Sequence, residues 1–128
     1  MISELLNFFE YLHKNNYVYR DLKPDNVMID VNKTIILIDF DRMLTTDITD
    51  DQKLTTDFQS SFADPEVNSG EILFANDIYS IGKMILFILD LDLNIENSTK
   101  YSDEIKILCL IIKQCFDKNP DKRLSIID

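Results

Sequence analysis

The sequence predicts one mainly α-helical domain with a small β-hairpin. Three stretches of the chain indicate helices: in the first and third, apolar residues recur at helical spacing, and the second is apolar on nearly all sides. Two short runs of β-branched residues, joined by a four-residue turn, lie between the first and second of these stretches. The chain has 128 residues, of which 45% are hydrophobic, so it can bury the core of one domain or of a piece of one.

The first predicted helix covers about residues 3–14. Its apolar positions follow the three- and four-residue spacing of one helix face: Ile2, Leu5, Leu6, Phe9 and Leu12. His13 is the only histidine of the chain and falls at the C-terminal end of this helix. There the helix dipole favours the charged form of histidine, so His13 is expected to be a solvated terminal residue and not a catalytic group. A β-prone stretch follows at residues 17–20.

The predicted β-hairpin consists of residues 27–29 and 34–38, and a polar loop that contains Pro24 precedes it. Asn26 stands just before the first strand and Asp39 just after the second. In an antiparallel hairpin these two positions lie at the same end, across from each other. We therefore expect the two side chains to lie close together.

The rest of the chain is predicted to hold a long loop and then further helices. Residues 41–62 lack a regular pattern, and a loop of that length in a compact domain is usually functional or mobile. Residues 72–89 are apolar on nearly all sides, which predicts a helix at the centre of the domain. Another helix is expected over residues 103–116, with Ser102 as its cap, and residues 124–128 are expected to begin one more.

Charge and hydropathy exclude several classes of function. The chain has 13 basic and 23 acidic residues and a net charge of −10, which argues against a nucleic-acid binder or an anionic-membrane binder. No apolar run reaches the roughly 18 residues of a membrane span, and the N-terminus does not resemble a secretory signal. Cys109 and Cys115 would point away from each other on one helix and cannot pair there, so a reduced, cytoplasmic environment is expected.

Five short motifs occur in order along the chain. They are Tyr-Arg-Asp-Leu-Lys-Pro-Asp-Asn at 19–26, Ile-Asp-Phe-Asp at 38–41, Phe-Ala-Asp-Pro-Glu at 62–66, Asp-Ile-Tyr-Ser-Ile-Gly at 77–82 and Cys-Phe-Asp-Lys-Asn-Pro-Asp-Lys-Arg at 115–123. Together they resemble the catalytic loop, the Asp-Phe-Gly motif, the Ala-Pro-Glu motif, the Asp-x-Trp-Ser-x-Gly helix and the closing arginine motif of eukaryotic protein kinases. Tyr19 takes the place of the usual histidine, and Asp41 that of the glycine.

The resemblance implies that residues 1–128 are the C-terminal lobe of a protein kinase domain. In that lobe the catalytic loop is 19–26, the activation segment is 39–66 and the central helix covers about 72–89. The smaller N-terminal lobe of the family, with its Gly-rich phosphate loop and strand lysine, is absent from these residues. The chain contains only two glycines, so it cannot form such a Gly-rich loop itself.

The resemblance also implies roles for four residues of the first two motifs in phosphoryl transfer from ATP to serine or threonine side chains of proteins. Asp21 would be the catalytic base, and Lys23 would neutralise the moving phosphoryl group and marks the serine/threonine type. Asn26 and Asp39 would be the Mg²⁺ ligands, because their oxygen atoms suit this hard cation. Met28 would lie beneath the adenine ring of ATP.

Other motif residues would have supporting roles, again by resemblance. Arg20 would receive an activation-loop phosphate, or an aspartate of the same acidic loop in its place. Asp77 would accept backbone N–H bonds from the catalytic loop and hold its shape. Glu66 and Arg123 would form a buried ion pair that joins the activation segment to the end of the chain.

Two aromatic residues and one substitution complete these expectations. Tyr19 and Phe40 would stack in the core behind the site. Asp41 stands where the family has a glycine with a free choice of φ, so it is expected to restrain the loop that follows. That loop, residues 41–61, is expected to be mobile.

Two interpretations stay open. The chain is part of a serine/threonine kinase that is active when an N-terminal lobe is present, or it is an inactive, pseudokinase-like binding module. In both cases we expect an exposed apolar face where the N-terminal lobe would lie, available to that lobe or to a partner protein. In the first case the substrate is a protein.

Overall fold

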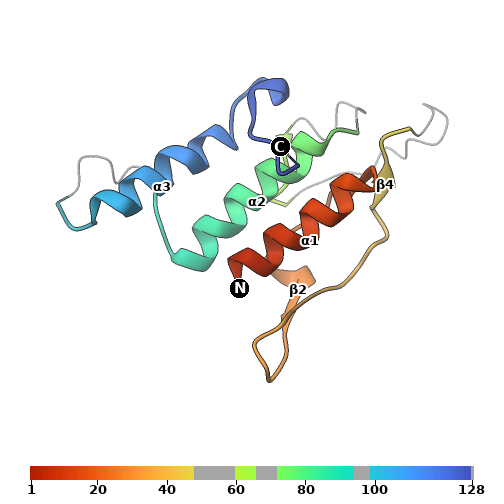
Figure 1. The fold of residues 1–128 in the computed structure, drawn as a ribbon, viewed down its shortest axis with the longest axis horizontal. Coiled ribbons are helices and arrows are strands. Elements are labelled where there is room, and N and C mark those ends of the chain that lie inside the picture. The colour runs from red at the N-terminus through yellow and green to blue at the C-terminus, as the bar shows by residue number, and fades with distance from the viewer. Residues whose placement is uncertain (48–59, 66–71, 94–98, 128) are drawn as a thin grey trace.

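The computed structural model describes residues 1–47, 60–65, 72–93 and 99–127. Its helices are α1 (Ile2–Lys14), α2 (Phe74–Leu89) and α3 (Asp103–Gln114), with short 3-10 turns η1 (Pro24–Asn26) and η4 (Pro120–Lys122). Its strands are β1 (Tyr17–Val18), β2 (Val27–Ile29), β3 (Ile35–Leu37) and β4 (Leu44–Thr45). The helices lie side by side, with α2 between α1 and α3 (Figure 1). This agrees with the predicted fold class.

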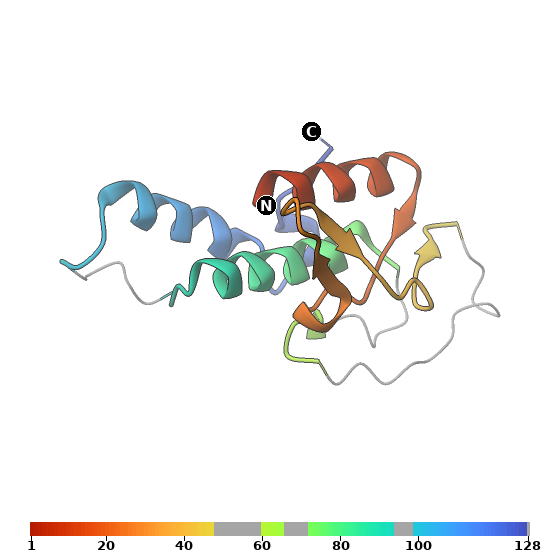
Figure 2. The same cartoon turned by 90° about the horizontal axis from the view of Figure 1, so that it is seen from below.

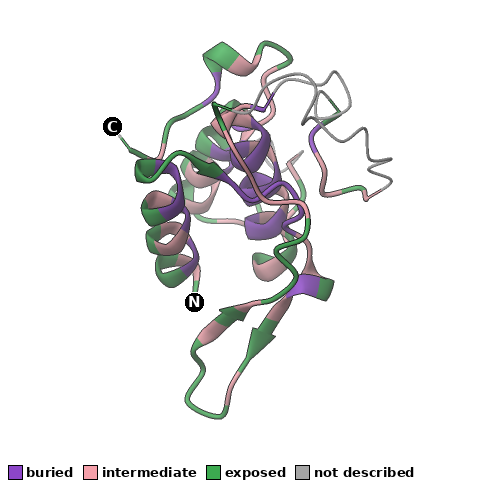
Figure 3. Ribbon diagram, turned by 90° about the vertical axis from the view of Figure 1, so that its right-hand side faces the viewer, coloured by how far each residue is buried: buried purple, intermediate pink, exposed green. Residues whose placement is uncertain are grey.

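Helix α2 is the centre of the molecule because both of its sides are covered. Figure 3 shows buried residues along much of its length. Its first turn is closed by Asn76, whose Oδ1 accepts a hydrogen bond of 2.9 Å from the backbone N–H of Leu73. Gly82 of α2 packs against the end of α3: a Cβ at this position would be 2.8 Å from the Cβ of Cys115. Glycine is therefore required there by space.

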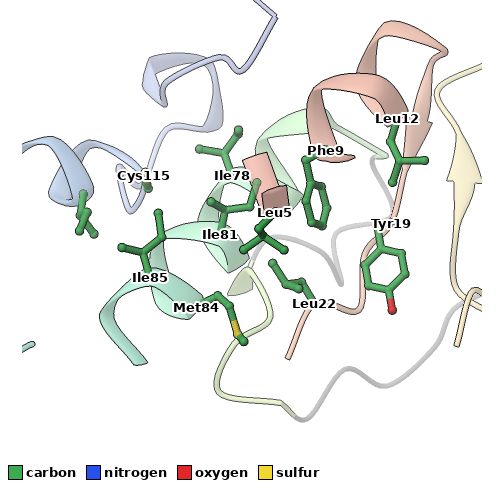
Figure 4. Packing of buried hydrophobic residues seen from close by; sticks show 11 residues of the cluster. Leu5, Phe9, Leu12, Tyr19, Leu22, Ile78, Ile81, Met84, Ile85 and Cys115 are labelled. Carbon is green, nitrogen blue, oxygen red and sulfur yellow. The ribbon is translucent and has the colours of Figure 1, made fainter. Parts of the chain in front are cut away.

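The hydrophobic core joins the three helices to the loop that follows β1. Figure 4 shows the side chains of α1, this loop and α2 converging. The buried members of the core are Leu5, Phe9, Leu12, Tyr19, Leu22, Ile78, Ile81, Met84, Ile85, Ile112 and Cys115. Tyr19 and Leu22 are almost completely buried although they belong to a loop. Tyr19 and Leu22 thus anchor the loop to the core on either side of Arg20 and Asp21.

Strands β2 and β3 form the predicted antiparallel hairpin, which projects from the body of the molecule in Figure 3. Val27 pairs with Leu37 and Ile29 with Ile35. The carboxylate of Asp30 closes the turn by accepting backbone N–H bonds of 2.9 and 2.8 Å from Asn32 and Thr34. The register agrees with the prediction that residues 26 and 39 lie at the same end of the hairpin.

A second pair of strands lies in the region predicted to be an irregular loop. Strand β4 pairs with β1 in antiparallel fashion, with Val18 opposite Leu44 and Tyr17 opposite Thr45. Figure 2 shows that β4, which follows the hairpin in the chain, lies beside β1, the strand after α1. Each strand has only two residues, too few for an alternating pattern to be visible in the sequence.

The end of the chain differs from the prediction. Residues 124–127 are not helical, and α3 ends at Gln114, two residues before the predicted end. The hydroxyl of Ser125 accepts a 3.3 Å hydrogen bond from the backbone N–H of Ile127. Serine side chains that bond to nearby backbone in this way compete with helix formation. In the described part of the chain, no helix is long and apolar enough to cross a membrane.

Candidate functional site

The backbone of the loop after β1 is held by Asp77, a fully buried residue of α2. Its Oδ2 accepts a hydrogen bond of 2.9 Å from the backbone N–H of Tyr19, and its Oδ1 accepts one of 2.8 Å from Arg20. Arg20 has a left-handed φ of 73°. This conformation costs a non-glycine residue roughly 1–2 kcal/mol, and bonds to a charged acceptor offset such a cost. These are the hydrogen bonds that the motif resemblance implied for Asp77.

His13 also binds Asp77, and it is buried, so the prediction of a solvated His13 was wrong. Its Nε2 lies 2.9 Å from Asp77 Oδ2, and its ring stacks on Phe74 with centroids 4.6 Å apart. His13 lies four residues after Phe9 and eight after Leu5, on the buried face of α1. The helical spacing that located Leu5 and Phe9 could have located His13 as well, because side chains four residues apart share a face.

Asp21 and Asn26 form the buried centre of the site. The amide nitrogen of Asn26 donates one hydrogen bond to the Asp21 backbone carbonyl (2.7 Å) and one to Asp21 Oδ2 (2.9 Å). The other carboxylate oxygen of Asp21, Oδ1, lies 3.8 Å from Lys23 Nζ and 4.0 Å from Arg42 Nη1. One oxygen is thus fixed by an amide, and the other lies beside two cations.

Lys23 and Arg42 line a broad cleft of about 710 Å³ next to Asp21. The other lining residues are Pro24, Asp25, Ser60, Ser61, Phe62 and Phe87. Both cationic side chains are about one-third exposed, so they can also contact a ligand in the cleft. Arg42 was not among the expected site residues, because the second motif ends one residue before it.

Asn26 and Asp39 lie at the same end of the hairpin. The backbone N–H of Ile38 donates a 2.9 Å hydrogen bond to the Asn26 carbonyl, which ties the two strand ends together. Asp39 is exposed, and its Oδ1 accepts a 3.3 Å bond from the backbone N–H of Asp41. The Asn26 amide oxygen and the Asp39 carboxylate are hard donors that fit Mg²⁺. Within the described ranges, no group of three or more histidine, cysteine, aspartate or glutamate side chains forms a complete protein cage for a metal.

Tyr19 connects these groups. Its hydroxyl donates a 2.5 Å hydrogen bond to the Ile38 carbonyl. Burial raises the pKa of the Tyr19 hydroxyl well above its usual range, and the negative charges of Asp21, Asp39 and Asp77 add to this rise. Tyr19 therefore stays a neutral hydrogen-bond donor among three carboxylates.

Three other expectations about this region have different outcomes. Phe40 was expected in the core, stacked with Tyr19; it does contact Tyr19 edge-on, with centroids 5.5 Å apart, and Phe8 at 6.5 Å, but it is 44% exposed. Asp41 was expected to restrain the loop that follows it, and this stays a prediction; in this motif the residue with a left-handed backbone is Asp39, with φ of 63°. Met28 lies on β2 and is 55% exposed, and its role toward adenine stays a prediction.

Arg20 is buried beside Asp77. Burial lowers the pKa of its guanidinium; the charge of Asp77 opposes this effect, and that of Arg42 adds to it. The loop aspartates proposed as partners of Arg20 fall mostly on residues 48–59, which lie outside the described part of the chain. The expected activation-loop behaviour therefore stays a prediction.

Arg123 forms a buried ion pair with Asp64. Its Nη1 and Nη2 donate hydrogen bonds of 2.5 and 3.1 Å to the two carboxylate oxygens, and Nη1 also donates to the Ala75 carbonyl at 2.9 Å. Asn76 Nδ2 donates a further 2.9 Å bond to Asp64. Glu66, the partner that the motif resemblance implied for Arg123, lies outside the described residues. The described carboxylate that binds Arg123 is therefore that of Asp64, two residues before Glu66, and the motif did not point to it.

Comparisons with known proteins agree with the order of the motifs. A family model described as the protein kinase domain matches residues 1–128. The chain is similar to a probable serine/threonine-protein kinase, mkcF, of Dictyostelium discoideum, with 30% identity over 138 residues, which cover 96% of this chain and 20% of that protein. It is 26% identical over 143 residues to serine/threonine-protein kinase D of Synechocystis sp., covering 98% of this chain and 28% of that protein.

A third relative is an SNF1-related protein kinase catalytic subunit, alpha KIN12, of Arabidopsis thaliana. The identity is 34% over 110 residues, which cover 83% of this chain and 22% of that protein. The chain therefore spans less than a third of the length of each of these three relatives.

Proposed function

The chain belongs to the protein kinase family, and from this premise we propose that residues 1–128 form the C-terminal lobe of a serine/threonine kinase domain. The family uses ATP and Mg²⁺ and acts on proteins. The proposed reaction is the transfer of the γ-phosphoryl group of ATP to a serine or threonine hydroxyl of a protein. The names of the relatives and Lys23 of the catalytic loop support the serine/threonine class.

The observation that carries the proposal is the environment of Asp21. Asn26 holds one carboxylate oxygen at 2.9 Å, and the other lies beside Lys23 and Arg42 at the cleft. A general base needs a fixed orientation and one oxygen within reach of the substrate hydroxyl. Asn26 fixes the orientation of Asp21, and its free oxygen lies beside two cations that line the cleft. On this basis we assign Asp21 the role of base, and Lys23 the role of neutralising the transferred group.

Asn26 and Asp39 are the proposed Mg²⁺ ligands, and Met28 the proposed contact of the adenine ring. When bound, Mg²⁺·ATP would supply the phosphoryl group and the cation that balances its charge. Asn26 is buried and its amide nitrogen is bound to Asp21, so its oxygen is the atom that it offers to a cation. Asp39 offers a carboxylate at the exposed end of the hairpin.

Asp77 and Arg123 are the proposed positioning residues. Asp77 fixes the backbone on the N-terminal side of Asp21 through Tyr19 and Arg20. Arg123, through Asp64 and the Ala75 carbonyl, joins the segment before Glu66 to the start of α2. A shift of about 1 Å in a catalytic group is enough to slow a reaction strongly, so both should matter for rate although neither is placed at the reacting atoms.

The test is a chimaera in which the N-terminal lobe of a known serine/threonine kinase is fused ahead of Met1. In this protein Asp21→Asn should lower phosphoryl transfer to a protein substrate by at least about 100-fold, the usual size of a lost general base. Glu10→Gln is the matched control, because Glu10 belongs to an exposed pair with Lys14 and such pairs contribute little. Equal rates for the parent chimaera and Asp21→Asn would contradict the assignment.

A binding module without turnover is the second candidate. It is favoured by one observation: the 128 residues contain two glycines and hence no Gly-rich phosphate loop. The transcript sequence immediately upstream of the codon for Met1 separates the two candidates. A reading frame that continues upstream into a Gly-rich loop and a strand lysine supports the enzyme, whereas an in-frame stop codon there supports the module.

We also propose that the protein is cytoplasmic and that a protein surface, either the N-terminal lobe or a partner, covers the exposed face of the hairpin. Both cysteines are free and buried, as in proteins of reducing compartments. Met28, Ile29 and Ile36 of the hairpin are 46–55% exposed. Microscopy of the tagged protein in its own cells would test the location.

A further inference from the structure

Two cationic side chains lie beside one and the same carboxylate oxygen at the cleft. Lys23 Nζ is 3.8 Å and Arg42 Nη1 is 4.0 Å from Oδ1 of Asp21. The two nitrogens are therefore at most 7.8 Å apart, which is the sum of these two distances. Both distances are longer than a hydrogen bond of about 3 Å, so neither nitrogen occupies the bonding position on Oδ1. The oxygen assigned to the acceptor hydroxyl thus has a cation on two sides.

The backbone that carries Arg42 is fixed by a turn and by the second pair of strands. The backbone N–H of Met43 donates a 3.1 Å hydrogen bond to the Phe40 carbonyl and closes the turn that contains Arg42. Two residues after Arg42, strand β4 begins and pairs with β1. Strand β1 runs directly into the loop that carries Asp21 (Figure 2). The pairing of β1 with β4 therefore brings Arg42 to Asp21.

The charges at the cleft favour an anionic ligand. In the described part of the chain, the charged residues that line it are Lys23, Arg42 and the exposed Asp25, in a molecule with a net charge of −10. The charge of Arg42 also lowers the pKa of the Arg20 guanidinium, so a third cation lies nearby. Cations held close together repel each other, and an anion bound between them relieves this repulsion. A guanidinium has five N–H donors, so Arg42 can bind an anion and keep its contacts within the protein.

We propose that Arg42 is a further catalytic residue, which binds the γ-phosphoryl group of ATP together with Lys23; this rests on the proposed kinase function. A phosphoryl group has three terminal oxygens, and each accepts charge-assisted hydrogen bonds at about 2.8 Å. One such group can therefore contact both nitrogens, because these are at most 7.8 Å apart.

In the proposed step, the hydroxyl oxygen of the substrate serine or threonine forms a bond to the γ-phosphorus. The bond between this phosphorus and the oxygen that bridges it to the β-phosphate breaks, and its electron pair leaves with ADP. The hydroxyl proton passes to Asp21 Oδ1. Lys23 and Arg42 each hold a positive charge beside the phosphoryl oxygens, over which negative charge is spread in the transition state.

The first test is the steady-state kinetics of the chimaera with an N-terminal lobe. Arg42→Gln should lower kcat at least about 10-fold, less than the roughly 100- to 1,000-fold of a buried donor because Arg42 is one-third exposed. The KM for the protein substrate should stay within about two-fold, since a contact with the group in transfer acts on kcat. Arg42→Lys keeps the charge and should recover part of the loss.

The charge-matched control is Lys118→Gln, at an exposed position that is not part of the cleft lining in the described residues, and it should keep the parent kcat. An unchanged kcat in Arg42→Gln would overturn the proposal. A raised KM with unchanged kcat would also overturn it, because Arg42 would then bind the protein substrate and not the group in transfer.

The second test needs no turnover, so it separates this proposal from the kinase activity. The purified 128-residue chain is titrated with inorganic phosphate at constant ionic strength, with sodium chloride as the reference, and the side-chain NMR signals of Arg42 and Lys23 are followed. Phosphate should shift both signals with a Kd of about 1–10 mM. Arg42→Gln should weaken phosphate binding at least about three-fold, a size typical of one exposed charge pair, and Lys118→Gln should leave it unchanged.

The two tests together keep the two proposals apart. An Arg42 signal that does not respond to phosphate, or that responds equally to chloride, would refute the role of Arg42 even in an active chimaera. An inactive chimaera whose isolated chain binds phosphate at Arg42 would count against the kinase function and support the anion site.

Discussion

At the scale of single residues, Asp77 binds three groups from two different segments of the chain. Its two oxygens accept bonds from the backbone of Tyr19 and Arg20 and meet the ring of His13, all at 2.8–2.9 Å. Without these oxygens, the buried backbone N–H groups of Tyr19 and Arg20 would lose the carboxylate that they bind. One buried side chain thus sets the conformation of the loop that carries Asp21.

Asp77→Asn is expected to destabilise the fold strongly. An amide has one acceptor oxygen, so its NH₂ group would face a backbone N–H or the histidine instead of accepting from it. The expected loss is about 3 kcal/mol in the free energy of unfolding, because a buried charged acceptor is removed and its donors stay. Urea unfolding followed by circular dichroism measures it. Asp121→Asn, at an exposed position of η4, is the control, and a loss for Asp77→Asn as small as that of the control would contradict the network.

The Cys115 thiol should make the free energy of unfolding decrease at alkaline pH. Burial raises the pKa of its thiol from 9.0 to about 11, and the nearby Arg123 only partly opposes this. Because the folded pKa lies above the unfolded one, the thiol's contribution is complete below pH 9.0 and is lost as pH rises toward 11. Two pKa units correspond to about 2–3 kcal/mol.

The measurement compares the parent chain with Cys115→Ser by urea unfolding at several pH values across this window. The parent should lose stability more steeply than the variant, because serine does not titrate there. Parallel pH curves for the two proteins would mean that the Cys115 thiol is as acidic in the folded chain as in the unfolded one.

At the scale of elements, the contact between α2 and the end of α3 depends on Gly82. Alanine normally favours a helix over glycine by about 1 kcal/mol. Here its Cβ would lie 2.8 Å from Cys115 Cβ and 2.9 Å from the Phe116 ring, distances that force side chains or helices apart. Overpacking costs about 1–3 kcal/mol, so Gly82→Ala should be destabilising on balance.

The melting temperature of Gly82→Ala tests this expectation. The same substitution is also made in a chain that carries Phe116→Leu. A smaller side chain at 116 removes part of the clash, so Gly82→Ala should cost less in that background than in the parent chain. A higher melting temperature for Gly82→Ala in the parent would show that helix propensity exceeds the steric cost.

The elements differ in how well their sequence predicts them. Helices α1 and α3 have periodic patterns over 12 or more residues, α2 lies in a stretch that is apolar on nearly all sides, and the hairpin has two β-branched runs around a turn, so all four were predicted. Strands β1 and β4 were not paired in the prediction because two residues carry no period. Their pairing depends on contacts between residues 17–18 and 44–45, which only the folded chain brings together.

The residues of the candidate site also differ in how well the sequence predicts them. The family resemblance of the motifs pointed to Asp21, Asn26 and Asp77; the structure brings Asp21 and Asn26 within hydrogen-bond distance, and their catalytic and metal-binding roles stay predictions. His13 was misplaced because the rule for helix ends was applied in preference to the periodicity of α1. Asp64 was missed because the motif favoured the glutamate two residues later, and a choice between neighbouring carboxylates depends on backbone geometry that a motif does not record.

At the scale of the whole molecule, the chain alone should bind Mg²⁺·ATP weakly. The cations beside Asp21 are Lys23 and Arg42, both about one-third exposed, and the sequence has no Gly-rich loop to donate backbone N–H bonds to phosphates. Calorimetry with the purified chain should give a Kd weaker than about 100 µM. Submicromolar affinity would show that these 128 residues hold the nucleotide without a second lobe.

The hydrogen bonds of Asp77 also determine when the loop can fold during synthesis of the chain. Asp77 is 58 residues from Tyr19 and 64 from His13, whereas the hairpin strands are joined by a short turn. Hairpins close in about 1–10 µs, but synthesis proceeds at about 5–20 residues per second. On the ribosome the hairpin can therefore form seconds before the loop that precedes it. The residues assigned to phosphoryl transfer would reach their geometry only after α2 has emerged, so a nascent chain that stops before residue 77 should have no organised site.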